Sequence, residues 1–252
     1  MNNLEKKIEA IIICFRYLDY LSLTLPRTLE VFDHVIVVTL PNDPVETYCK
    51  SLNSDKLTVI STNIMFEDGA NWNKGAGIAQ GLQYLKYNQF FCTIDSDIYL
   101  HSNFHSDFFN FAKDKEMAYG SRRFLLPTRK DFDDFVSEKT TEQDYLLLRG
   151  AIYGFFAIFS CESAAYQNFL KKHNNIGYIY WIGENHTIDW LYLREWAGAT
   201  MVYNPEPTTK YPDFHYDQHN DYLIGLAKEL PFHVAHLGDP GQTGKEKELS
   251  FK

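Results

Sequence analysis

Short apolar runs alternate with amphipathic stretches along the first hundred residues of the chain. Runs rich in Ile, Val and Phe, each of the length of a buried strand, occupy residues 8–15, 34–39, 57–60 and 90–94. Helical patterns fill residues 18–32 and 45–52, and Ile78, Leu82 and Leu85 repeat at the spacing of one helix face. This alternation predicts an α/β fold, a mostly parallel central sheet flanked by helices.

The second half of the chain is less regular. The pattern predicts a helix at residues 104–112 and short strands at 117–119, 152–159 and 232–236. Residues 131–143 are polar and acidic without helical or strand periodicity, so we expect a surface loop or a flexible lid there.

The pattern contains no internal repeat and no clear boundary, which favours a single domain. We expect this domain to cover residues 1–240, with a nucleotide-binding-like half at about 8–100 and a less regular half at about 101–240. The Gly-rich and then charged residues 241–252 are expected to form a mobile tail.

Two carboxylates, Asp95 and Asp97, directly follow the fourth predicted strand, with Ser96 between them. In open α/β sheets, ligands bind at the carboxyl ends of the strands. Neighbouring carboxylates repel each other unless a cation lies beside them, and carboxylate oxygens suit Mg2+ or Mn2+. The pattern favours a metal–diphosphate site, although a solvated turn after a core strand explains Asp-x-Asp equally well.

Charge and cysteine content narrow the possible partners and compartment. The net charge of −9 disfavours a nucleic-acid partner held by phosphate contacts, while leaving room for a local basic patch. The basic residues near positions 122 and 129 suit a phosphate-bearing acceptor, or simply a solvated surface. The four cysteines are far apart, and no signal peptide or membrane-length apolar run is present, so we expect reduced thiols in a cytoplasmic protein.

Several short motifs follow one another along the chain: Trp72-Asn73-Lys74-Gly75, Gly81-Leu82, Ile94-Asp95-Ser96-Asp97-Ile98, Gly154-Phe155-Phe156, Asp189-Trp190 with Arg194-Glu195-Trp196, and His236-Leu237-Gly238. Taken in this order, they resemble those of the GT-A glycosyltransferases, most closely the family-2 type. The resemblance covers about residues 8–240 and implies a nucleotide-binding half at about 8–100 and an acceptor half at about 101–240. It implies a Rossmann-like GT-A fold, a nucleotide-sugar donor (a UDP-sugar by preference), Mn2+ or Mg2+ as cofactor, and a hydroxyl acceptor of unknown class.

The resemblance also implies a set of residues that contact the donor. The base and ribose are expected over the ends of the first two strands, the phosphates near a helix start, and the sugar beside a glycine-containing strand. These donor-binding residues are Phe15, Arg16, Tyr17, Asp43, Asn73, Lys74, Asp95, Ser96, Gly154 and Phe155. Taken alone, the same residues also fit a strand exit, a turn between prolines, a helix cap and core packing.

By the same resemblance, Asp97 and His236 are the metal ligands, and Asp95 contacts the ribose or reaches the metal through water. A histidine ligand favours Mn2+ over Mg2+. His233 is a competing ligand, but residues 233 and 236 face opposite sides of a strand, so at most one of them can point to the metal.

The general base implied by the resemblance is Asp189, at the start of a helix, in a reaction that inverts the anomeric centre. Many of the similar enzymes carry an acidic pair where this chain has Ile188-Asp189, so Glu184 is a second candidate. Three other functions stay open. They are transfer to a modified base in DNA, a non-catalytic sugar-nucleotide or glycan binding protein, and a nucleotidyltransferase, which would need a Gly-rich loop where this chain has Arg16-Tyr17-Leu18-Asp19.

Overall fold

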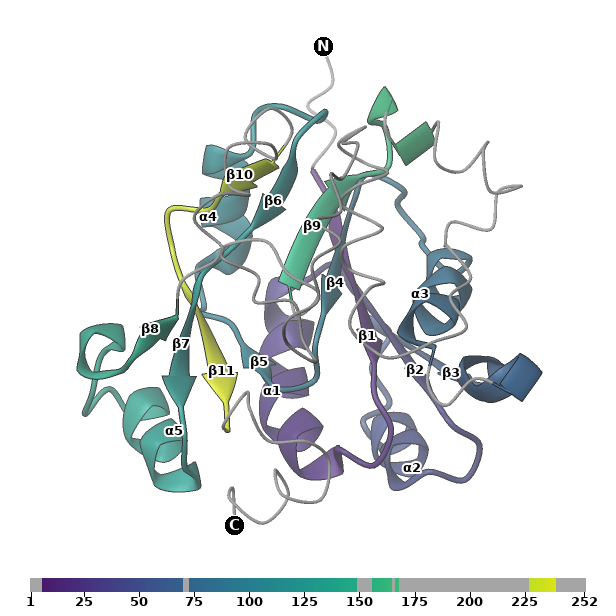
Figure 1. Ribbon diagram of the computed structural model, residues 1–252, viewed down its shortest axis with the longest axis horizontal. Helices are drawn as coiled ribbons and strands as arrows, with labels where there is room; N and C mark the ends of the chain where they lie inside the picture. The colour runs from purple at the N-terminus through teal and green to yellow at the C-terminus, as the bar shows by residue number, and fades with distance from the viewer. Residues whose placement is uncertain (1–5, 70–72, 149–155, 165, 168–226, 239–252) are drawn as a thin grey trace, which may run out of the picture.

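The computed structural model describes residues 6–69, 73–148, 156–164, 166–167 and 227–238 of the 252-residue chain. Seven strands of this part form the central sheet: β1 Ile8–Ile13, β2 His34–Thr39, β3 Leu57–Ser61, β4 Phe90–Ile94, β6 Ala118–Gly120, β9 Phe156–Ser160 and β10 Ala227–Glu229. Their order is β10-β6-β9-β4-β1-β2-β3 (Figure 1). The first four strands pair in parallel, as predicted, whereas β9 runs antiparallel to both β4 and β6.

Helices cover both faces of the central sheet. Helices α1 Leu18–Val31, α2 Pro44–Ser51 and α4 Phe104–Phe111 bury apolar side chains against one face, together with Ile8, Ala10 and Ile12 of β1. The other face carries α3 Lys74–Leu82 and the short 3-10 helix η1 Ile64–Gly69. Within the described residues, no helix is long and apolar enough to cross a membrane.

Helix α3 lies unusually close to β1, and a glycine makes this possible. A Cβ atom added at Gly81 would meet Cγ2 of Ile11 at 2.6 Å, a distance that real Cβ contacts do not reach. The close packing fixes α3, and therefore the residues at its start, relative to the sheet.

Helix α1 continues through Pro26 without interruption. Proline has no N–H to donate to the carbonyl of Ser22, four residues earlier. The hydroxyl of Tyr48, in α2, donates to that carbonyl oxygen at 3.4 Å and compensates for the missing bond.

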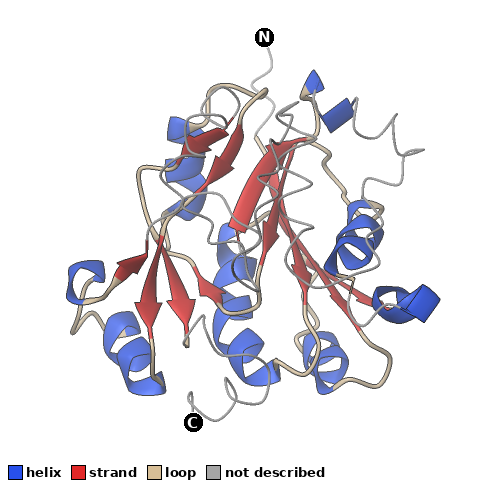
Figure 2. Ribbon diagram, in the orientation of Figure 1, coloured by secondary structure: helices blue, strands red, loops and turns tan. Residues whose placement is uncertain are grey.

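A second, smaller sheet lies beside the first (Figure 2). It contains β5 Ile98–Tyr99, β7 Arg123–Leu126, β8 Leu147–Leu148 and β11 Val234–Leu237, in the order β5-β11-β7-β8. Because β5 begins directly after the Asp95–Asp97 turn and pairs with β11, this sheet brings the last described strand beside that turn.

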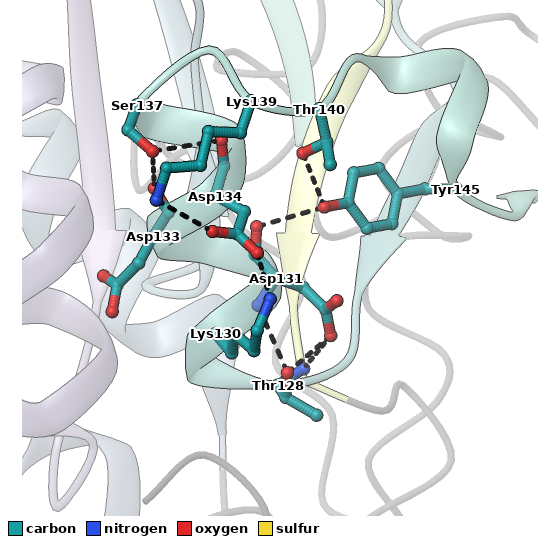
Figure 3. Close-up of polar contacts among 9 residues, drawn as sticks. All are labelled: Thr128, Lys130, Asp131, Asp133, Asp134, Ser137, Lys139, Thr140 and Tyr145. Carbon is teal, nitrogen blue, oxygen red and sulfur yellow. Dashed lines mark hydrogen bonds and ion pairs between the residues drawn. The ribbon is translucent and has the colours of Figure 1, made fainter.

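The prediction of a loop or lid at residues 131–143 is wrong for its first half. Helix α5 spans Arg129–Val136, and a 3-10 turn, η2, spans Glu142–Asp144. Thr128 and Asp131 form a capping box at the start of α5 (Figure 3). Ion pairs one turn apart add support, since Arg129 contacts Asp133 and Lys130 contacts Asp134.

Aromatic residues within this polar segment pack α5 against the smaller sheet. Phe132 is buried, and Phe135 packs against Phe124 of β7 with ring centroids 5.1 Å apart. The hydroxyl of Tyr145 lies 2.8 Å from that of Thr140 and donates to the carbonyl of Asp131 at 3.2 Å (Figure 3).

A buried carboxylate, Glu9, and a partly buried one, Asp33, stabilise the edge of the central sheet opposite the carboxyl ends of β1 and β2. Glu9 accepts hydrogen bonds from the backbone amides of residues 86, 87 and 88, and its Oε1 lies 2.9 Å from Nδ1 of His34. Asp33 accepts from the amide of Ile8 and pairs with Lys7 and His105. Burial tends to raise the pKa of Asp33, but these hydrogen bonds outweigh it and lower the pKa below its ordinary value.

Candidate functional site

The residues that follow β1, β2 and β4 meet at one edge of the sheet. The backbone N–H of Arg16, after β1, donates to Oδ2 of Asp43, after β2, at 3.0 Å. The Asp95–Asp97 turn follows β4, which is the other neighbour of β1. Parallel strands therefore place these three segments side by side, where α/β sheets bind their ligands.

The two acids of the Asp95–Asp97 turn lie in different surroundings. The turn is closed by the amide of Ile98, which donates to the carbonyl of Asp95 at 3.2 Å. The Asp95 side chain is 35% exposed, whereas the Asp97 side chain is 9% exposed. The backbone carbonyl of Asp97 accepts from the amide of Leu237 at 2.9 Å, so β11 holds the second acid in place.

Asp97 and His236 face each other in the interior of the protein. Oδ2 of Asp97 lies 3.7 Å from Nε2 of His236, and both side chains are nearly inaccessible to solvent. Strand β11 determines this placement, because His236 pairs with Ile98 in the ladder between β11 and β5. His233 points elsewhere, and its Nδ1 lies 3.5 Å from a carboxylate oxygen of Glu142. The alternation of side chains along a strand predicts this separation.

Asp95 makes an ion pair with the lysine at the start of α3. Nζ of Lys74 lies 2.6 Å from Oδ1 of Asp95. Asn73 caps the helix, since its Oδ1 accepts from the amide of Ala76 at 2.9 Å. The amide nitrogen of the Asn73 side chain is buried and has no hydrogen-bond partner among the described residues. A cation and a capped helix start therefore lie beside the acidic turn.

The donor set of Asp97 and His236 fits a divalent ion that shares its shell with a ligand. One carboxylate and one imidazole suit Mn2+, and two bonds of about 2.1 Å from one ion can reach both atoms. The described residues contain no group of three or more His, Cys, Asp or Glu side chains that could hold a metal. A closed structural site is therefore absent from this part of the chain, and the ion would need further oxygens, such as those of a phosphate.

Aromatic and basic side chains gather beyond the end of β1. The guanidinium of Arg16 lies over the ring of Phe15, 5.7 Å from its centroid. The Phe15 ring meets Phe66 edge to face at 5.4 Å. Phe66, in η1, is a member of this cluster that the sequence pattern does not indicate, because only the tertiary fold brings η1 to the end of β1.

Asp43 holds the backbone of this region. Its Oδ1 caps α2 by accepting from the amide of Val45 at 2.9 Å, and its Oδ2 binds the amide of Arg16. Arg16 has a φ of 63°, a left-handed conformation that costs energy in a residue with a side chain. Because both Asp43 oxygens already bind backbone amides, Asp43 shapes the loop that carries Arg16 and Tyr17.

The four cysteines, Cys14, Cys49, Cys92 and Cys161, are buried thiols. Burial raises the pKa of Cys49 and of Cys161 to about 12, and raises the pKa of Cys14 and of Cys92 as well. These thiols therefore stay protonated at neutral pH and offer no nucleophile.

Comparisons with known proteins yield structural relatives. No protein-family model matches the sequence, and no curated protein matches it significantly. S. aureus TarS (residues 1–349) aligns with a TM-score of 0.51 at 13% identity, over 76% of this chain and 56% of TarS 1–349. A mycobacterial protein also aligns at a TM-score of 0.51, with 10% identity over 94% of this chain and 69% of that one.

A looser likeness links the chain to glucosyl-3-phosphoglycerate synthase from Mycobacterium tuberculosis. That enzyme, crystallised with Mn2+, UDP and glucosyl-3-phosphoglycerate, aligns at a TM-score of 0.47 and 12% identity, over 97% of this chain and 75% of that one. A TM-score below 0.5 supports no inference about the site.

TarS is a GT-A glycosyltransferase. This chain has the GT-A fold. The predicted fold class is thereby confirmed, with a mostly parallel central sheet flanked by helices in a single domain. At 13% identity or less the likeness concerns the fold alone, and the chain spans only a little over half of TarS 1–349.

Within this GT-A fold, the structure brings together most of the predicted site residues. The structure places the residues predicted to contact the base at the ends of β1 and β2: Phe15, Arg16, Tyr17 and Asp43. Around the acidic turn lie Asn73, Lys74, Asp95, Ser96, Asp97 and His236. Gly154, Phe155, Glu184 and Asp189 lie outside the described residues, so their roles remain predictions.

The basic residues near position 129 are less available to bind a phosphate group than the sequence suggests. Arg129 and Lys130 pair with Asp133 and Asp134 of the same helix. Both basic groups therefore have acidic partners within α5, which weakens the case that they hold a phosphate-bearing acceptor.

Proposed function

We propose that this chain transfers a sugar from a nucleotide-sugar donor to a hydroxyl acceptor, using a divalent cation held by Asp97 and His236. The observation that supports this most is the convergence of these two buried side chains, 3.7 Å apart, from β11 and the turn after β4. In a GT-A fold this position lies at the ligand-binding edge of the sheet. A buried carboxylate facing an imidazole at this position is explained if both side chains coordinate a divalent ion that also binds a diphosphate.

Each neighbouring residue has a defined part in this proposal. When bound, Mn2+ or Mg2+ would supply positive charge that stabilises the departing nucleoside diphosphate. Lys74, at the start of α3, is close enough to the turn to bind a donor phosphate, while its ion pair keeps Asp95 oriented. Phe15, Arg16 and Tyr17 would contact the base, on the loop that Asp43 holds.

The choice of donor and of catalytic base rests on the resemblance to the GT-A glycosyltransferases. We propose a UDP-sugar as donor, with Gly154 and Phe155 beside the sugar. Asp189, or Glu184 in its place, would remove the proton from the acceptor hydroxyl opposite the leaving diphosphate, which gives inversion. The acceptor belongs to a class still to be found by screening.

Two structural features weigh against the alternative functions. A nucleotidyltransferase would need a Gly-rich loop after β1, where this chain has the Arg16 backbone bound to Asp43. Transfer to a base in DNA would need a positive surface, whereas the net charge is −9 and two of the basic residues near the smaller sheet pair within α5.

The test is a donor screen that measures release of free nucleoside diphosphate. The purified chain is incubated with UDP-, GDP- and dTDP-sugars in Mn2+, with and without an array of acceptors, and matched samples contain excess EDTA. We expect release from a UDP-sugar in Mn2+ and none in EDTA. If the chain binds UDP but releases no nucleoside diphosphate with any acceptor, a sugar-nucleotide binding protein is favoured. Full release of nucleoside diphosphate in EDTA would overturn the metal-dependent mechanism.

A further inference from the structure

The Asp95–Asp97 turn is hydrogen-bonded to helix α1, which contributes none of the proposed metal ligands. The hydroxyl of Thr24, in α1, donates to the backbone carbonyl of Ser96 at 2.7 Å. Thr24 is 1% exposed, so this bond lies in the protein interior. The bond ties the middle residue of the turn to the buried face of α1.

A hydroxyl inside a helix ordinarily bonds to the carbonyl four residues earlier. Thr28, one turn further along the same buried face, does so with the carbonyl of Thr24 at 3.0 Å. The Thr24 hydroxyl lies 3.4 Å from the corresponding carbonyl of Tyr20 and 2.7 Å from that of Ser96. Its shorter bond therefore leaves its own helix and reaches the turn.

The side chain of Ser96 is also directed inward. Ser96 is 9% exposed, and its side chain lies near the Cys14 thiol, just after β1. On the far side of the turn, the amide of Leu237 donates to the Asp97 carbonyl. Main chain and side chain of the turn are thus held between β1, α1 and β11, which limits where the Asp97 carboxylate can point.

We propose that Thr24 is a positioning residue of the cation site, whose hydroxyl fixes the turn so that Asp97 faces His236. The proposal rests on the proposed function, because the cation and the nucleotide are those of the glycosyl transfer. Thr24 contacts neither of them and acts only through Ser96. This gives α1 a role beyond covering the sheet, since it begins just after Arg16 and Tyr17 and carries the hydroxyl that binds Ser96.

The experiment compares Thr24→Val, Thr24→Ser and Thr28→Val with the unmodified chain. Mn2+ affinity is measured by calorimetry in saturating UDP, and amide hydrogen exchange is followed over residues 95–98. Thr28→Val is the matched control, because it removes a buried hydroxyl from the same face of α1 without touching the turn.

We expect Thr24→Val to weaken Mn2+ binding by about tenfold or more, the range for removal of an outer-shell partner. Thr24→Ser should restore affinity to within about threefold, because it keeps the hydroxyl, and Thr28→Val should bind like the unmodified chain. Exchange at the Ile98 amide, which closes the turn, should rise in Thr24→Val alone.

Two results would overturn the proposal: unchanged Mn2+ affinity and exchange in Thr24→Val, or an equal loss in Thr28→Val. If Thr24→Val fails to fold, Thr24→Ala takes its place in the experiment. A Thr24→Ser variant that binds Mn2+ no better than Thr24→Ala would then contradict the proposal. If the unmodified chain binds no Mn2+ with UDP, the proposed function fails, and exchange at Ile98 alone then decides whether Thr24 holds the turn.

Discussion

The ammonium of Lys74 lies 2.6 Å from a carboxylate oxygen of Asp95, so the start of α3 and the first acid of the turn form one ion pair. The pair leaves the two acids of the turn in different roles. Asp95 is neutralised by a neighbour, while the more deeply buried Asp97 faces His236. Asp97 is thereby left as the acid of the turn that can bind a cation.

Replacing this lysine should affect the nucleotide and the cation in different ways. We expect Lys74→Gln to weaken UDP binding about tenfold, because one charge-assisted hydrogen bond to phosphate is lost. The affinity for Mn2+ without nucleotide should be no lower, since removal of a positive charge makes the site more negative. Calorimetric titrations with UDP and with Mn2+ measure both. Lys50→Gln is the control, as Lys50 is exposed and pairs with Glu46 in α2.

The left-handed backbone of Arg16 predicts opposite effects on stability and binding. Arg16→Gly should leave the protein as stable or up to about 1 kcal/mol more stable, because glycine adopts a φ of 63° without strain. UDP binding should weaken, because the guanidinium over Phe15 is lost. Urea unfolding and UDP titration test this. Arg16→Ala removes the same side chain but keeps the strain, so a stability equal to that of Arg16→Gly would contradict the argument.

Gly238 makes β11 depend on α1. It has a φ of 77°, and a Cβ atom there would lie 2.8 Å from the hydroxyl oxygen of Tyr20. Gly238→Ala should therefore destabilise the protein by about 1–2 kcal/mol and displace His236, which lowers Mn2+ affinity. Adding Tyr20→Phe removes the nearest atom, so it should recover part of the stability. No recovery would mean that the backbone conformation, and not the contact, is limiting.

The hydrophobic pattern predicts the first half of this fold well, because β1 to β4 are continuous apolar strands separated by amphipathic helices. It misses α5, whose order comes from a capping box, ion pairs and two phenylalanines within a polar segment. It also says nothing of the antiparallel β9 between β4 and β6, since strand order depends on contacts distant in sequence.

The candidate site is likewise only partly predictable from local sequence patterns. The Asp-x-Asp spacing and the resemblance indicate the acidic turn, Lys74 and His236. The support that holds them does not appear in any local pattern, because Thr24, Tyr20 and Phe66 look like ordinary core residues. Their significance lies in tertiary contacts with Ser96, Gly238 and Phe15.

Asp33 makes the stability of the fold depend on acid pH. Its pKa is lower in the folded protein than its ordinary value of 3.8, so it stabilises the fold above that value and the effect fades as the pH falls through the folded pKa. Asp33→Asn should cost about 1–2 kcal/mol at pH 7 and less at pH 3, below the ordinary pKa. Urea unfolding of both proteins at the two pH values measures this. An equal cost at both would show that the charge of Asp33 is not responsible.

The central claim is that Asp97 and His236 hold a divalent cation together. The most direct measurement is a calorimetric titration of Mn2+ in saturating UDP with the unmodified chain, Asp97→Asn, His236→Gln and the double variant. His233→Gln is the matched control, because that ring points to Glu142 instead. We predict that each single change weakens Mn2+ binding about tenfold or more, that the double change costs less than the sum of the two, and that His233→Gln binds normally. Unchanged Mn2+ affinity in both Asp97→Asn and His236→Gln would contradict the account.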